Sequence, residues 1–205
     1  MLTRIAALAL ALTTAANAGG FAKPASEDRA EAPHMMRPTP PPSRDDLEIA
    51  LAMRREHNLA AFHAYWKGGV YPHNTYRTGP LNVWRDAEGH LCAAATMISK
   101  DGHDDLAQKT GTENNNIRLL DVTQGELLDW MLTSGLTIED IDMIQMPAME
   151  PIRVDQETLA AEDAKLLKGY KATEIYLKKH VKDDLDTATD RLLARPDLAW
   201  RLLDS

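Results

Sequence analysis

The residue types best suited to chemistry lie close together, between residues 73 and 103 of this 205-residue chain. Cys92 is the only cysteine, and His73, His90 and His103 are spread around it. A cysteine that follows an extended segment and begins a helix has a lowered thiol pKa, because the helix dipole and the free amide groups stabilise the thiolate. With a histidine as base, this arrangement is typical of a thiol-dependent hydrolase or transferase in which Cys92 is the nucleophile.

Two observations favour a different role for Cys92. The signature residues of known cysteine hydrolases are missing, and His90 lies only two positions before the cysteine, which suits a base poorly if both follow one extended direction. A free cysteine is also among the residue types most often buried. The preferred interpretation is therefore that Cys92 packs beneath the helix that follows it, and that the protein is not an enzyme.

The same histidines raise the question of a metal site. Together with Asp101 or Asp104, His73, His90 and His103 are of the ligand types that zinc accepts. Their spacing matches no standard zinc site, so the sequence predicts neither a metal nor another cofactor.

Aromatic residues near this segment suggest a binding surface for a protein, a peptide or a glycan. The candidate residues are Tyr71, Tyr76, Arg77, Trp84 and Trp66. Aromatic rings offer a large apolar area and, in tyrosine and tryptophan, a polar group as well. The alternative is that these rings belong to the core, since only 5% of the chain is aromatic.

The elements that must position these residues form a short β element, a turn and a helix. Residues 81–85 alternate apolar and polar side chains, which predicts a half-buried strand. Residues 86–89 end in glycine and are typical of a turn. Small and apolar residues from Cys92 to Ile98 predict a buried helix that Asp101 and Gly102 close.

Capping signals and helical spacing predict helices over most of the remaining chain. Ser43, Thr123, Thr137 and Asp155 are the expected N-caps, and Gly135 separates two helices of an αα-hairpin over residues 123–147. The fold class is therefore mainly α, or α+β at most. The predicted helices span 43–67, 104–109, 123–135, 137–147, 155–181, 183–194 and 197–203.

The first 42 residues are expected to lie outside the folded domain. Residues 1–18 contain one basic residue, eight apolar residues (5–12) and an Ala-x-Ala site, which is the pattern of a signal peptide cleaved after Ala18. Residues 19–42 end in a proline run and predict an extended linker. We expect a periplasmic or secreted protein, with one helical domain over 43–205 and no membrane segment once the signal is removed.

Charge excludes some partners. The net charge is −8, and residues 101–150 hold two basic residues against eleven acidic ones. This imbalance argues against nucleic acid or an anionic membrane as a partner. A cationic partner fits the charge, and an acidic solvated surface is the alternative.

Residues 71–147 also resemble a known family, on the strength of several short motifs. The motifs are Gly89-x-x-Cys92-Ala93, a helix with Trp130, Ser-Gly-Leu-Thr at 134–137 and Ile-Gln-x-Pro at 144–147. This pattern is similar to that of a family of uncharacterised exported bacterial proteins. The chain departs from it at residues 94–96 and by the insertion of Met146. The resemblance implies an exported module over 71–147, with 151–205 as a C-terminal helical extension, and it implies no particular activity.

Overall fold

A side chain caps the first long helix, as the sequence predicts. In the computed structural model, which describes residues 40–75, 77–146, 148–151 and 155–205, helix α1 spans Arg44–Gly68. The Ser43 Oγ accepts a hydrogen bond from the Asp46 backbone N–H at 3.4 Å. The helix ends at Gly69, whose φ of 68° is left-handed and favours glycine.

The described residues are mainly helical, which confirms the predicted fold class, and they contain no continuous strand. No described helix is both long enough and apolar enough to cross a membrane. The other elements are α2 (Ala93–Lys100), α3 (Asp104–Glu113), the 3₁₀ turn η1 (Leu119–Asp121), α4 (Glu126–Thr133), α5 (Ile138–Gln145), α6 (Gln156–Lys179), α7 (Val181–Leu193) and α8 (Pro196–Leu203).

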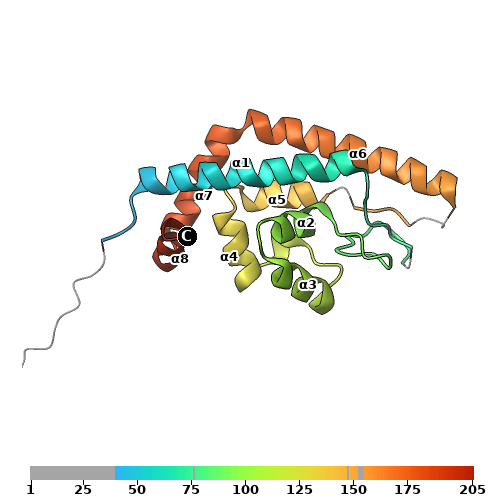
Figure 1. Ribbon diagram of the computed structural model, residues 1–205, viewed down its shortest axis with the longest axis horizontal. Helices are drawn as coiled ribbons and strands as arrows, with labels where there is room; N and C mark the ends of the chain where they lie inside the picture. The colour runs from blue at the N-terminus through green and yellow to red at the C-terminus, as the bar shows by residue number, and fades with distance from the viewer. Residues whose placement is uncertain (1–39, 76, 147, 152–154) are drawn as a thin grey trace, which may run out of the picture. The chain divides into compact units, whose positions relative to one another are not determined.

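Two long helices, α1 and α6, lie side by side along one edge of the folded unit, and the short helices α2 to α5 pack beneath them (Figure 1). Asp155 is the N-cap of helix α6, and its Oδ1 accepts from the Thr158 N–H at 2.9 Å, so the predicted cap is confirmed. The chain then turns at His180 into α7, and α8 packs against both α7 and α1.

The αα-hairpin is present, but its first helix starts later than expected. We predicted a cap at Thr123; instead α4 begins at Glu126 after Gly125, which has a φ of 89° and no side-chain cap. The second cap is confirmed, since Thr137 and Asp140 form a reciprocal capping box. The predicted end at Pro147 lies outside the described residues, and α5 ends at Gln145.

The turn of this hairpin requires a glycine for a reason that sequence pattern alone does not reveal. A Cβ atom at Gly135 would lie 2.0 Å from the Leu51 carbonyl oxygen and 2.5 Å from the Arg55 backbone nitrogen of α1. The φ of 76° adds a second constraint that favours glycine. The Ser-Gly-Leu-Thr segment therefore sets how closely α4 and α5 approach α1.

The predicted strand at 81–85 is a set of single bridges. Leu81 pairs with Met149, and Arg85 pairs with Leu91, each in an isolated antiparallel bridge. Between them, the Trp84 N–H donates to the carbonyl of Asn115 at 2.8 Å. Because successive residues find different partners, no continuous ladder forms, and the prediction of a regular strand is corrected to an irregular extended segment.

Candidate functional site

Cys92 stands at the start of α2, as predicted, but it belongs to the hydrophobic core. Its Sγ accepts a hydrogen bond from the Ala95 N–H at 3.4 Å, and the residue is only 1% exposed. Burial raises the pKa of the thiol to about 12, because the loss of solvent outweighs the amide groups of the helix N-terminus. The burial of Cys92 agrees with the preferred interpretation of the sequence, and the lowered pKa that the nucleophile hypothesis required does not occur.

The three candidate histidines have separate partners. His73 Nε2 lies 2.8 Å from Asp163 Oδ1, and His90 Nδ1 lies 3.0 Å from Asp86 Oδ2. His103 precedes α3 without capping it by its side chain. No hydrogen bond described in the structure joins one of these histidines to Cys92. The described residues thus contain neither the predicted thiol–histidine pair nor the metal set that combined the three histidines.

The aromatic residues proposed for binding divide between the core and the surface. Trp84 is fully buried and donates from Nε1 to the Ala107 carbonyl at 2.9 Å. Tyr71 is 2% exposed, and its hydroxyl donates to the Trp66 carbonyl at 2.6 Å. These two rings are core residues, which was the alternative for them, so Trp84 and Tyr71 do not form part of the expected binding surface.

Three further residues of that set have different positions. Trp66 is half-buried and donates from Nε1 to Glu174 Oε2 at 2.7 Å, and Arg77 is exposed. Tyr76 lies outside the described residues. Trp66 and Tyr71 do share one hollow of about 440 Å³ with Asp163 and Lys171.

A larger cleft lies at the other end of α2, where the turn into α3 faces α4 and α8. Its volume is about 710 Å³, and two residues considered as metal ligands from the sequence, His103 and Asp104, line it. The remaining lining residues are Arg54, Gly102, Asp105, Leu106, Glu126, Asp129, Trp130, Thr133, Leu198, Arg201, Leu202 and Ser205. We call this hollow the acidic cleft, because four of its side chains are carboxylates.

Both arginines of the acidic cleft are already paired. Arg54 Nη1 donates to Asp101 Oδ1 at 2.9 Å, beside the cleft, and Arg201 Nη2 donates to Asp129 Oδ2 at 2.8 Å. The indole Nε1 of Trp130 donates to the other oxygen of Asp101 at 2.9 Å. Asp129 also accepts from Arg195 at 3.2 Å, so Arg201 is only partly neutralised, and the excess negative charge of the cleft comes from Asp104, Asp105 and Glu126.

Those carboxylates are exposed on the cleft wall. Asp104 accepts a hydrogen bond from the Ser99 hydroxyl, and Glu126 lies 3.2 Å from the ammonium of Lys109 in an exposed pair. The side chain of Asp105 makes no ion pair or hydrogen bond within the described part of the chain. An exposed pair of the Glu126–Lys109 kind contributes little, so all three groups are able to attract a cationic ligand.

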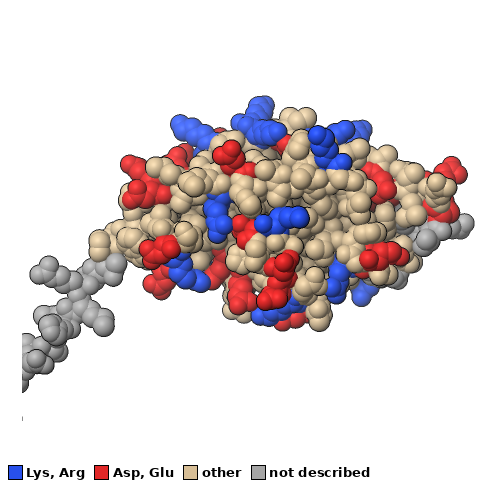
Figure 2. All heavy atoms as spheres, in the orientation of Figure 1, with Lys and Arg blue, Asp and Glu red and all other residues tan. Residues whose placement is uncertain are grey.

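Outside the acidic cleft, charge is distributed differently. Figure 2 shows basic and acidic side chains mixed over the visible face, with several of the basic ones along its upper edge. The sequence indicated the acidic surplus of residues 101–150, but it could not indicate that α8 forms one wall of the cleft. Arg54, Trp130 and Arg201 were therefore missed as candidates, because only the tertiary fold brings them to Asp101 and Asp129.

The acidic cleft, rather than the surroundings of Cys92, is the candidate functional site. It is open to solvent, and it combines an apolar floor with carboxylates. Among the described residues, no cysteine lines it, and His103 is its one histidine. Its geometry is that of a binding site. Comparisons with protein-family models, with curated proteins and with solved structures found no match to this chain.

Proposed function

We propose that this chain is an exported, non-catalytic protein that binds a basic peptide segment of a partner protein in the acidic cleft. The signal-peptide pattern of residues 1–18 supports export to the periplasm or the medium. The observation that carries the proposed binding function is the row of carboxylates Asp104, Asp105 and Glu126 on the wall of a cleft of about 710 Å³.

Electrostatics favours a cationic ligand in this cleft. Arg54 is paired with Asp101, and Arg201 shares Asp129 with Arg195, whereas Asp105 is unpaired among the described residues. Lysine or arginine side chains of a ligand would gain Coulomb energy there at low ionic strength. A nucleic acid or another polyanion would be repelled.

The floor of the cleft favours a ligand that also has apolar side chains. Leu106 is half-buried, and Trp130, Leu198 and Leu202 are between 4% and 6% exposed. An apolar side chain that enters the cleft would cover exposed area mainly at Leu106, and it would contact the small exposed parts of the other three residues. A segment that alternates basic and apolar residues therefore fits better than a free cation or a glycan.

The alternative of a thiol-dependent hydrolase or transferase has less support. The Cys92 sulfur is enclosed by the core, and burial raises the pKa of its thiol to about 12, so little thiolate forms at neutral pH. A substrate would have to open the core before it reached the sulfur.

Binding is tested with a fluorescent peptide of alternating lysine and leucine, using fluorescence anisotropy at low and high salt. We expect binding at low salt that weakens as salt is added. In the double variant Asp105→Asn, Glu126→Gln, two exposed charge interactions of about 0.5 kcal/mol each are lost, so affinity should fall about fivefold.

Two controls make this test specific. A peptide of alternating glutamate and leucine has the same length and apolar content and should not bind. The variant Asp183→Asn, Asp197→Asn removes two acids that do not line the acidic cleft, and it should bind like the unaltered protein. Equal affinity of both double variants, or binding of the acidic peptide, would contradict the proposal.

A further inference from the structure

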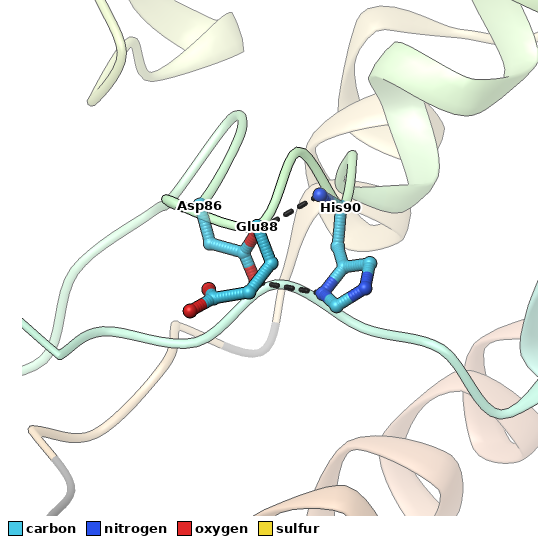
Figure 3. A group of neighbouring side chains, drawn as sticks. All are labelled: Asp86, Glu88 and His90. Atoms are coloured by element: carbon cyan, nitrogen blue, oxygen red, sulfur yellow. Dashed lines mark hydrogen bonds and ion pairs between the residues drawn. The ribbon is translucent and has the colours of Figure 1, made fainter. Parts of the chain in front are cut away.

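One group of metal-ligating side chains lies apart from the acidic cleft, in the turn that precedes α2. Asp86, Glu88 and His90 each offer a ligand atom, and these atoms all lie within 4.8 Å of one another. Figure 3 shows the three side chains on the same side of the turn, with the Asp86 carboxylate directed at the His90 ring. The described residues contain no other group of three such ligands.

The backbone holds the turn closed around these side chains. The Asp86 N–H donates to the His90 carbonyl at 3.1 Å, and the Gly89 N–H donates to the Asp86 carbonyl at 3.2 Å. The flanking residues Arg85 and Leu91 form an antiparallel bridge. The positions of the two outer ligands, Asp86 and His90, are therefore set before any ion binds.

The side chains differ in how freely they move. The Asp86 carboxylate is fully buried, and it accepts from the His90 N–H at 2.8 Å and faces His90 Nδ1 at 3.0 Å. The His90 side chain is 40% exposed, so the open side of the site is in contact with solvent. Glu88 is exposed, and its side chain has no ion pair or hydrogen bond to any described residue.

We propose that this turn binds a divalent transition-metal ion, of which Zn²⁺ is the best fit, through Asp86, Glu88 and His90, with water as the fourth ligand. Bonds of about 2.0–2.2 Å in a tetrahedron place neighbouring ligand atoms about 3.3 Å apart. The 3.0 Å separation of Asp86 Oδ2 and His90 Nδ1 is already close to that value. The exposed Glu88 completes the set by a change of side-chain rotamer.

Ligand chemistry selects the class of metal. Two carboxylates and one neutral imidazole carry a charge of −2, which balances a divalent ion. An imidazole nitrogen suits zinc and its neighbours in the first transition row. Calcium and magnesium instead require six or more oxygen ligands, some of which are water molecules. The ion replaces the contact between Asp86 and His90, so both groups must be unprotonated at the ligating atoms, and affinity falls at acidic pH.

The ion would cross-link the turn that leads into α2. Its three ligands lie within five residues, and the bridge between Arg85 and Leu91 stands directly outside them. Binding to the folded chain alone stabilises it by mass action, so the melting temperature should rise with Zn²⁺ concentration.

The test is a titration of the metal-free protein with Zn²⁺ alone, in competition with a chromophoric chelator. Glu88→Gln is the decisive variant, because the exposed side chain has no partner that folding would lose. We expect one ion per folded chain, and a loss of affinity of about tenfold or more in Glu88→Gln and in His90→Gln. The variant Glu113→Gln removes an exposed acid from α3 and should bind like the unaltered protein.

Thermal melting of the same proteins provides a second reading. At one Zn²⁺ concentration, the melting temperature of the unaltered protein and of Glu113→Gln should rise equally, and that of Glu88→Gln should rise less. The proposal is overturned if Glu88→Gln binds Zn²⁺ as tightly as the unaltered protein, if neither binds, or if Mg²⁺ or Ca²⁺ competes equally at the same concentration. It is independent of the acidic cleft, since none of its ligands lines that cleft.

Discussion

The two ends of helix α2 differ in their access to solvent. At its N-terminus, Cys92 is 1% exposed and its thiol is sealed in the core. At its C-terminus, Gly102 and His103 open onto the acidic cleft, and the buried carboxylate of Asp101 fixes Arg54 and Trp130 beside it. The end with the more reactive residue type is inaccessible, while the end with ordinary polar residues is available to a ligand.

Residue type identifies possible chemistry, whereas burial decides whether that chemistry is used. A helix N-terminus stabilises a thiolate only where solvent or a counter-charge helps to support the charge. In the core, loss of solvent dominates, and the pKa of Cys92 rises to about 12.

The largest expected effect concerns the reactivity of Cys92. Labelling of the folded protein with a thiol reagent should be slower than labelling of the unfolded chain by about a thousandfold at pH 8, because a pKa of about 12 leaves far less thiolate than the usual value near 8.5. The rates are measured between pH 4 and 9, with and without denaturant. Fast labelling of the folded protein, with an apparent pKa below 8.5, would restore the thiol-enzyme hypothesis.

An intermediate effect is expected at the open end of α2. Asp101→Asn removes a carboxylate with a side chain only 4% exposed, which accepts from Arg54 and from the Trp130 indole. Loss of these charge-assisted hydrogen bonds should lower the free energy of unfolding by about 2 kcal/mol. Urea denaturation measures this change.

The matched control for Asp101→Asn is Asp105→Asn, an exposed acid of the same cleft whose side chain makes no described ion pair or hydrogen bond. Its free energy of unfolding should change by less than about 0.5 kcal/mol. If both variants are destabilised equally, Asp101 does not organise this end of the helix, and the contrast between the buried and the exposed carboxylate fails.

The smallest effect is a pH dependence away from α2, at the contact of α5 with α7. The Arg191 guanidinium, bound to both oxygens of Glu139, lowers the pKa of this carboxyl from 4.5 to about 2. A depressed pKa in the folded state gives stability that is present above pH 4.5 and is lost as pH falls from 4.5 toward 2. Because the side chain of Glu139 is 59% exposed, the contribution should be below about 1 kcal/mol.

Acid titration of the unfolding free energy measures this contribution, and Glu139→Gln is the comparison. The variant should lack the share of the pH dependence between pH 4.5 and 2 that Glu139 provides, and its stability at pH 7 should be slightly lower. Identical pH profiles of the two proteins would show that the pair of Glu139 and Arg191 does not hold in solution.

Local signals predicted much of the fold and little of the candidate site. The caps at Ser43, Thr137 and Asp155 were predicted because a cap joins a side chain to a backbone group three residues away. The predicted cap at Thr123 was wrong, because Gly125 adopts a φ of 89° and α4 begins only after this glycine. Local rules compete there, and sequence pattern does not rank them.

Local sequence signals were enough to predict the mainly helical class, the helix at Cys92, the αα-hairpin with its glycine turn and the acidic surplus of residues 101–150. Which polar groups are buried, and which distant segments meet, follows from the tertiary packing. Three features join residues that are far apart in the chain. They are the close approach of Gly135 to α1, the burial of Cys92 in the core, and the contribution of α8 to the wall of the acidic cleft. Burial depends on such long-range packing, and burial sets both the pKa and the accessibility of a side chain.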